Sequence, residues 1–323
     1  MKYRRVGDTE LETSEVGLAV WPLSTEVWRG TDEEALAFLK RAYDLGVNYY
    51  DTADVDGKGK GEELLGKAFA GNREMVILGT KVGYDFYNDE SANGIVGSRR
   101  FDSDYVRYAV DQSLARLGTT FIDILQVHDP TMEAVQDDAL WQTIEALREE
   151  GKIRYFGAVL GPGIGHHDEG VYAMRKRGAT TLSTMYNLLE QDPGRKFFTV
   201  ALESMTGIVL RNPHANGVLD DSVASPADVK RGGYYPTRTE GWGREAIAKR
   251  QKLAWIQKDG MTIGQAALKA YLWEETVPSV LVETQDPARL EELCAAPDKR
   301  DYVREEIAEI AEQYRRNYDV PKA

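Results

Sequence analysis

Short runs of β-branched and aromatic residues alternate with amphipathic segments along most of the chain. Such runs are typical of parallel strands that are buried on both faces of a sheet. Between them apolar residues recur at helical spacing, as in segments 104–117 and 139–147, and each such segment predicts a helix that packs on a sheet. The runs that we expect to be strands lie at 15–20, 47–50, 75–78, 122–127, 154–159, 181–185, 207–210 and 279–282.

Glycines mark the ends of several predicted helices: Gly46, Gly118, Gly151 and Gly178 each follow an amphipathic segment. Eight strands, most of them followed by a helix, predict a (β/α)8 TIM barrel of the α/β class, and the chain length suits such a barrel with insertions. We expect one domain over residues 1–323, with an N-terminal hairpin, a long late loop over 212–242 and a C-terminal helix over 302–318. Such a long loop is usually a lid or an ordered insertion.

A doubly wound sheet is the competing arrangement. It favours a Gly-rich phosphate loop after an early strand. The segment GPGIG at 161–165 comes too late in the chain, and it carries a Pro where a helix should open. The sequence therefore favours the barrel.

Charge and composition narrow the set of partners. The 323 residues carry 40 Lys and Arg against 53 Asp and Glu, a net charge of −13 that disfavours binding to nucleic acid or to anionic lipid. No apolar run approaches the roughly 18 residues of a membrane span. Cys294 is the one cysteine, which excludes a disulfide framework, and the first residues lack the apolar core of a secretory signal. We expect a cytoplasmic protein with a small-molecule substrate and leave the oligomeric state open.

Three polar residues stand at the ends of neighbouring predicted strands. Asp51, Lys81 and His128 end the second, third and fourth strands, and barrel active sites form at the C-terminal ends of strands. Each residue alone also has a structural interpretation, since an Asp at that place often caps a helix and a lone His is often a core residue. Their joint position indicates a site, because an Asp–Lys pair beside an imidazole would perturb pKa values there.

Motifs spread over essentially the whole chain resemble the aldo-keto reductase superfamily. They are GLAVW at 17–21, DTAD at 51–54, GTK at 79–81, DILQVH at 123–128, GKIRYFG at 151–157 and YNLLE at 186–190. The run PHANGVL at 213–219 resembles a branch that has PHSSGLL at that place. The resemblance implies a reductase that binds NAD(P)H without a Rossmann domain and transfers hydride to an aldehyde or ketone.

The family's catalytic tetrad is incomplete in this sequence. The resemblance matches its Asp, Lys and His to Asp51, Lys81 and His128, but an alignment without gaps places Asp56 where the family has its proton-donating Tyr. A carboxyl group beside Lys81 should have a lowered pKa and be ionised, unless burial raises it enough to act as an acid. Tyr49 and Tyr50 match aromatic core residues of the family and are not expected to replace the missing phenol.

The resemblance also assigns a cofactor site. Arg289 and Glu292 match residues on the adenosine side, and Glu283 stands where NADP-preferring members have Lys. A carboxylate at that place would repel a 2′-phosphate and accept hydrogen bonds from a ribose diol, so NAD is favoured over NADP if a cofactor binds at all.

The resemblance predicts altered contacts at the nicotinamide. Ser183 replaces a carboxamide-binding Gln, Leu160 and Gly161 lie near the place of a Ser-Asn pair, and Arg211 replaces an aromatic residue that stacks on the ring. We expect Trp21 and His214 in an aromatic-walled substrate pocket, with Trp28, His128 and the loop aromatics Tyr234, Tyr235 and Trp242 as further wall residues. The loop aromatics could equally pack on the barrel rim.

Two acidic and histidine clusters are weak metal candidates. His166 and His167 are adjacent, so their side chains point about 100° apart on a helix. A second cluster of Asp51, Asp54, Asp56 and His128 would share its space with Lys81. We expect no metal site.

Three functions remain open. The first is an oxidoreductase that uses a nicotinamide cofactor on a carbonyl or alcohol, with Asp56 in the place of the Tyr. The second is a barrel with altered chemistry, elimination or isomerisation, in which Asp56 abstracts a proton and Lys81 or His128 stabilises an enolate. The third is a catalytically silent binding or regulatory subunit.

Overall fold

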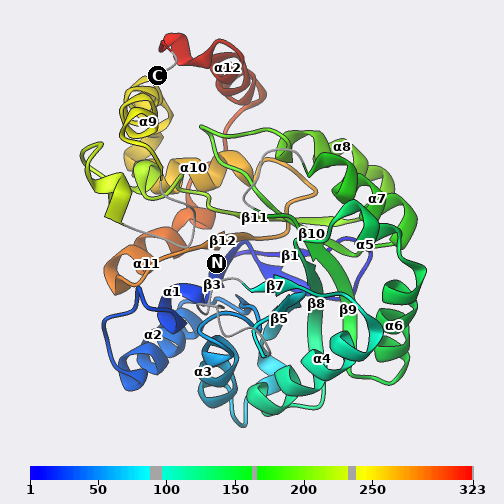
Figure 1. Cartoon of the computed structure of the whole chain (residues 1–323). Coiled ribbons are helices and arrows are strands. Elements are labelled where there is room, and N and C mark those ends of the chain that lie inside the picture. The colour runs from blue at the N-terminus through cyan, green and yellow to red at the C-terminus, as the bar shows by residue number, and fades with distance from the viewer. Residues whose placement is uncertain (88–96, 162–165, 232–237, 322–323) are drawn as a thin grey trace.

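Eight parallel strands form a closed barrel at the centre of the computed structural model, which describes residues 1–87, 97–161, 166–231 and 238–321. The barrel closes where Leu281 pairs with Gly17. It confirms the predicted TIM barrel, and Figure 1 shows the helices arranged around the strands. In chain order the strands are β3 (Val16–Ala19), β4 (Tyr49–Asp51), β5 (Ile77–Val82), β8 (Ile122–His128), β9 (Ile153–Val159), β10 (Thr181–Met185), β11 (Gly207–Arg211) and β12 (Val280–Val282).

Helices cover the outside of the barrel. Their starts follow local sequence rules: Thr31 and Glu34 form a capping box at α2 (Asp32–Asp44), and Asp102 caps α4 (Ser103–Leu117). The face of α2 that packs on the barrel consists of Ala35, Phe38, Leu39 and Ala42, at helical spacing. The other helices are α1 (Trp21–Ser24), α3 (Lys60–Ala68), α5 (Met132–Gln136), α6 (Asp138–Glu149), α7 (His167–Arg177), α8 (Gly194–Ser204), α9 (Glu240–Lys252), α10 (Ile263–Tyr271), α11 (Pro287–Cys294) and α12 (Arg304–Arg315).

Short single turns connect several of these elements. They are η1 (Arg73–Met75), η2 (Val218–Asp220), η3 (Asp228–Arg231), η4 (Ala254–Ile256), η5 (Lys258–Gly260), η6 (Ala296–Asp298) and η7 (Asn317–Asp319). Met75 therefore lies in η1 and not in the strand that its apolar character predicted, and its side chain is 59% exposed. Strand β5 itself begins at Ile77 and continues to Val82, so it includes Lys81.

The predicted N-terminal hairpin is present as β1 (Tyr3–Arg5) and β2 (Glu12–Ser14). Val6 and Leu11 between them are buried and pack in one cluster with the barrel residues Ile124 and Leu281. The hairpin thus covers one end of the barrel with apolar side chains. The C-terminal ends of the strands lie at the opposite end.

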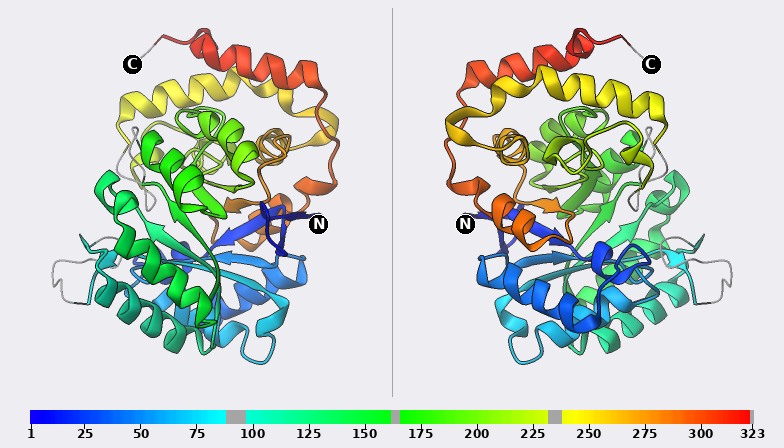
Figure 2. Two further views of the ribbon diagram at one scale, coloured as in Figure 1. Left: turned by 90° about the vertical axis from the view of Figure 1, so that its right-hand side faces the viewer. Right: turned by 90° about the vertical axis from the view of Figure 1, so that its left-hand side faces the viewer.

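The late loop, predicted over 212–242, is irregular apart from η2 and η3 over the described residues 212–231 and 238–239. Trp242 is an exception, because it lies on α9, where the guanidinium of Arg238 stacks 4.6 Å from its ring centre. Tyr234 and Tyr235 lie outside the described residues. Helices α9 and α12 run side by side on one flank of the barrel (Figure 2).

Candidate active site

Asp51, Lys81 and His128 come from three neighbouring strands and are all buried. The Lys81 ammonium forms an ion pair with Asp51 Oδ1, and it also donates to the Thr52 carbonyl at 2.5 Å. The other carboxylate oxygen of Asp51 accepts from Gln126 Nε2 at 3.0 Å. The buried pair is therefore well satisfied, which limits the cost of its desolvation.

Burial keeps the His128 imidazole neutral. Its pKa is well below the ordinary value, because burial disfavours the charged ring and the positive charges of Lys81 and Arg211 add to that effect. Nδ1 is buried without a hydrogen-bond partner among the described residues. The ring packs edge-on against Tyr84, with the ring centres 4.8 Å apart. His128 can therefore offer a neutral hydrogen-bond donor or acceptor.

Asp56 lies in the loop between β4 and α3, which is pressed against α1. A Cβ on the next residue, Gly57, would lie 1.9 Å from the Ser24 carbonyl oxygen, so only glycine fits there. The Asp56 carboxyl group is buried, and one of its oxygens accepts from the Thr52 hydroxyl at 3.3 Å. The other oxygen is buried without a partner among the described residues.

The protonation of Asp56 differs from the expectation of a lowered pKa. Burial raises the pKa of Asp56 to about 7, and it outweighs the opposing charge of Lys81. The negative charge of Asp51 adds to the increase. Proximity to Lys81 in the motif suggested an ionised carboxylate, but a desolvated carboxyl group beside an ion pair that is already matched titrates near neutral pH.

Asp54 is a second buried acid that the sequence analysis considered only as a metal ligand. It is fully buried, and neither of its carboxyl oxygens has a hydrogen-bond partner among the described residues. Burial, with the nearby charge of Glu62, holds its pKa well above the ordinary value. Glu62 itself is satisfied by the Thr80 hydroxyl at 2.6 Å and by Arg116 Nε at 2.7 Å. Burial and the charge of Glu62 thus favour the protonated form of Asp54, which lies two residues before Asp56 in the same loop.

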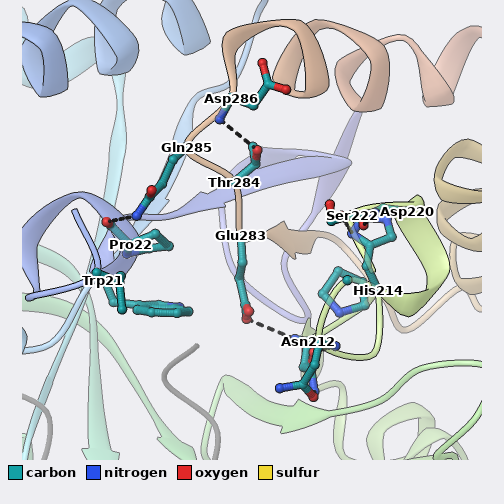
Figure 3. A pocket seen from close by; sticks show the side chains of 14 residues that line it. Trp21, Pro22, Asn212, His214, Asp220, Ser222, Glu283, Thr284, Gln285 and Asp286 are labelled. Carbon is teal, nitrogen blue, oxygen red and sulfur yellow. Dashed lines mark hydrogen bonds and ion pairs between the residues drawn. The ribbon is translucent and has the colours of Figure 1, made fainter. Parts of the chain in front are cut away.

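A cavity of about 430 Å³ lies between α1 and the loops that follow β11 and β12, and none of Asp51, Asp56, Lys81 and His128 lines it. Glu283 stands in its middle, with Trp21 on one side and His214 on the other (Figure 3). Glu283 Oε1 accepts from the backbone N–H of Asn212 at 3.1 Å. The full lining is Trp21, Pro22, Val27, Asn212, Pro213, His214, Asn216, Gly217, Asp220, Ser222, Glu283, Thr284, Gln285 and Asp286.

His214 and Trp21, predicted for the substrate pocket, therefore share the cavity with Glu283, which was predicted for the cofactor site, whereas His128 and Trp28 do not line it. His214 is buried, its pKa is lowered by burial, and Nε2 has no hydrogen-bond partner among the described residues. An unsatisfied buried nitrogen at a cavity wall is costly unless a ligand binds it.

Ser183 and Arg211 lie near the ends of β10 and β11. Arg211 Nη2 donates to the Leu160 carbonyl at 2.6 Å, so its side chain reaches from β11 to the residue that follows β9. Ser183 is on the strand between them, and its hydroxyl is buried without a partner among the described residues. The structure therefore places Leu160, Ser183 and Arg211 on or next to three neighbouring strands.

Arg289 and Glu292 lie on α11 and form an ion pair with each other. They are not among the residues that line the cavity. Glu292 also accepts a hydrogen bond from Thr262, the cap of α10. In this arrangement the pair ties α11 to α10.

His167 is exposed and contacts the neighbouring Asp168 at 2.9 Å. Within the described ranges, no group of three or more His, Cys, Asp or Glu side chains is placed to hold a metal ion. Among the described helices, none has the length and apolar character that crossing a bilayer requires.

Comparisons with known proteins point to one family for this chain. A model of the aldo/keto reductase family matches residues 15–315. An uncharacterized oxidoreductase of Bacillus subtilis (strain 168) is 29% identical over 326 residues, which cover 100% of this chain and 99% of that protein. The versiconal hemiacetal acetate reductase of Aspergillus parasiticus is 28% identical over 354 residues, with coverages of 100% and 98%.

Among solved structures, the holo form of an aldo-keto reductase from Bacillus halodurans superposes with a TM-score of 0.80 at 26% identity. The match covers 100% of this chain and 97% of that one. The likeness therefore extends from the N-terminal hairpin to the C-terminal helix.

Proposed function

Because the chain belongs to the aldo/keto reductase family, we propose that it is an oxidoreductase that uses a nicotinamide cofactor on a small carbonyl or alcohol substrate. In this proposal Asp56 moves the proton that the family's Tyr moves. Two relatives support the reaction class, because one is named as an oxidoreductase and the other as a reductase. The one cysteine, Cys294, is buried, which suits the reducing cytoplasm that we propose as the compartment.

The proposal rests on the place of Asp56, a buried carboxyl group with one oxygen unpartnered among the described residues, where burial raises its pKa to about 7. A general acid or base works best when its pKa lies near the operating pH, because both protonation states are then populated. Protonated Asp56 can donate to the oxygen of a carbonyl that is being reduced. Ionised Asp56 can accept the proton of an alcohol that is being oxidised.

The neighbouring residues set up this proton transfer. Lys81 is held by Asp51, and its positive charge stabilises the ionised state of Asp56 without forming a direct ion pair with it. His128 is neutral, so it can orient the substrate oxygen with a hydrogen bond and add no charge to the site.

The residues around the cavity fit a dinucleotide. When bound, the nicotinamide cofactor supplies or accepts the hydride. His214 Nε2 at the cavity wall is buried and has no partner in the described chain, so a polar ligand could satisfy it. The Ser183 hydroxyl is likewise buried without a partner in the described chain, but it does not line the cavity. The Glu283 carboxylate would repel a 2′-phosphate and could accept bonds from a ribose diol, which supports NAD over NADP. Arg289 and Glu292 would hold the adenosine end.

One observation favours a catalytically silent binding subunit as a second candidate. Arg211 stands where the family places an aromatic residue that stacks on the nicotinamide, and its guanidinium is already bonded to the Leu160 carbonyl. If that bond persists, the ring loses its stacking partner. The chain would then bind a nucleotide without transferring hydride.

Titration of NADH and NADPH separates these candidates. Trp21 lines the cavity, so binding should change tryptophan fluorescence. We expect NADH to bind and to be oxidised with some member of a panel of aldehydes, and NAD⁺ to be reduced with the matching alcohols. Binding without turnover across the panel would favour the silent subunit, and no binding of either nucleotide would overturn the oxidoreductase.

A further inference from the structure

A short hairpin beyond β5 carries an arginine toward the His128 side of the site. It consists of β6 (Tyr84–Asp85) and β7 (Ser98–Arg99), which pair antiparallel with Tyr84 opposite Arg99. Residues directly opposite in an antiparallel pair project from the same face. Arg99 and Tyr84 therefore share one face of this hairpin.

The contacts of Tyr84 identify that face as the one toward the active site. Its ring packs edge-on against His128, and its hydroxyl donates to Asp129 Oδ2 at 2.7 Å. The guanidinium carbon of Arg99 lies 6.0 Å from the Tyr84 ring centre. The charge of Arg99 also contributes to the lowered pKa of His128, so its field reaches the imidazole.

The next residue, Arg100, points the other way, as the alternation of a strand requires. Its guanidinium is bound by two carboxylates, Asp85 at 3.3 Å and Asp102 at 2.5 Å. Arg99 is exposed, and no carboxylate in the described part of the chain forms an ion pair with it. The two adjacent arginines thus differ in one respect: within the described residues, Arg100 is paired with carboxylates and Arg99, on the active-site face, is not.

The other cations near His128 are already engaged. Lys81 is paired with Asp51, and Arg211 donates to the Leu160 carbonyl. Asp129 is the acid on this side, and its Oδ2 is bonded to the Tyr84 hydroxyl. In a chain with a net charge of −13, an arginine left open at the site is a specific feature.

We propose that the substrate carries an anionic group, a carboxylate or a phosphate ester, beside its carbonyl or alcohol, and that Arg99 binds this anion. The guanidinium can hold either group with two parallel hydrogen bonds. Tyr84 packs in one cluster with Ala53 and Val55, which flank the Asp56 loop. The reacting carbon would lie toward Asp56 and His128 and the anion toward Arg99. This inference rests on the proposed function.

Matched substrates test the inference with the full chain and NADH. The ratio of kcat/KM for 4-carboxybenzaldehyde to that for the neutral 4-carbamoylbenzaldehyde measures recognition of a carboxylate. The ratio for glyceraldehyde 3-phosphate to glyceraldehyde measures recognition of a phosphate. We expect one of the two ratios to exceed unity in the native chain and to fall roughly tenfold in Arg99→Gln, the loss of about one exposed charge-assisted contact.

Arg100→Gln is the matched control, because it removes the same charge from the adjacent position and leaves Arg99 in place. It should keep the native ratio. A ratio that is unchanged in Arg99→Gln, or that falls equally in both variants, would overturn the assignment.

A binding measurement covers the case in which no aldehyde is turned over. Benzoate against benzamide, and phenyl phosphate against phenol, are titrated by tryptophan fluorescence at low and at high salt. We expect one of the anions to bind more tightly than its neutral partner, and this preference to shrink with salt and in Arg99→Gln. If the chain shows such a preference but turns over no substrate, the proposed oxidoreductase function is overturned and the proposed anion site at Arg99 is supported. No preference for either anion refutes the anion site.

Discussion

Lys81 donates to the Asp51 carboxylate and to the Thr52 carbonyl, so the negative charge of Asp51 offsets part of the effect of Lys81 on Asp56. This relationship explains why Asp56 is not a permanently ionised carboxylate. The positive charge lowers the pKa of Asp56, but burial and the negative charge of Asp51 raise it further, to about 7. Burial therefore makes Asp56 a proton carrier near neutral pH, and the charge of Asp51 offsets part of the opposing effect of Lys81.

The two reaction directions should depend on pH in opposite ways. The pKa of Asp56 is raised, so the group is protonated below about pH 7 and ionised above it. Alcohol oxidation needs the ionised base, so its kcat/KM should rise through this pH, and carbonyl reduction should fall through it. The pKa of His128 is well below its ordinary value, so His128 stays neutral and adds no second transition to the pH profile in this range. Profiles that rise or fall together in both directions would contradict the role of Asp56.

Removing the acid should abolish turnover but not nucleotide binding. Asp56→Asn keeps the size of the side chain and loses the proton, so we expect kcat to fall by about 10²-fold or more in both directions. The Kd for NADH, measured by fluorescence, should change little, because Asp56 does not line the cavity. Asp44→Asn, at an exposed position, is the control for a change of charge alone.

Asp56→Tyr tests whether the alignment is correct. If Asp56 stands at the place of the family's phenol, the variant should retain or gain aldehyde reduction and lose the rise and fall near pH 7. If the variant does not reduce aldehydes while still binding NADH, the register of the loop is wrong.

Cofactor preference should follow the charge of residue 283. Glu283→Lys replaces a repelling group by an attracting one, so the ratio of NADPH to NADH affinity should rise by about tenfold or more. Glu283→Gln keeps an oxygen that can accept from the Asn212 N–H and removes only the charge. Its ratio of NADPH to NADH affinity should therefore lie between those of the native chain and Glu283→Lys. If all three proteins have the same ratio of NADPH to NADH affinity, residue 283 does not contact the ribose of the bound cofactor.

Asp54 should make the fold less stable as pH rises. Its folded pKa lies well above the ordinary Asp value, so the folded state holds a proton that the unfolded state releases first. The stability that this group contributes is present at low pH and is lost as pH rises toward the folded pKa. We expect the stability of Asp54→Asn, relative to the native chain, to improve by on the order of 1 kcal/mol or more between about pH 5 and about pH 8.

Thermal or urea unfolding at both pH values provides the measurement, with Asp44→Asn as the exposed control. Asp56 contributes a pH dependence of the same sign in each protein, so the comparison measures the effect of Asp54 together with its effect on the titration of Asp56. A difference in stability that is independent of pH would mean that Asp54 is already ionised in the folded chain.

Local patterns in the sequence predicted the barrel and the positions of the strand ends. Asp51 and His128 end their strands and Lys81 stands near the end of its own, because parallel strands end at the same rim whatever their packing. Tyr49 and Tyr50 are completely buried, as their place in a strand predicted. Helix ends were readable too, since Gly118 and Gly178 adopt positive φ at their caps. These features depend on neighbours in the chain.

The chemistry of the site depends on neighbours in space. Burial, which no spacing of residues specifies, raises the pKa of Asp56 against the pull of Lys81. The contact of Arg211 with Leu160, 51 residues apart, arises only when β9, β10 and β11 lie side by side. Arg99 and Arg100 look alike in the sequence, and only the pairing of β6 with β7 turns one toward His128 and the other toward Asp85. The residue types determined a barrel with an incomplete tetrad, and tertiary packing decided their charges, because desolvation and distance exist only in the folded chain.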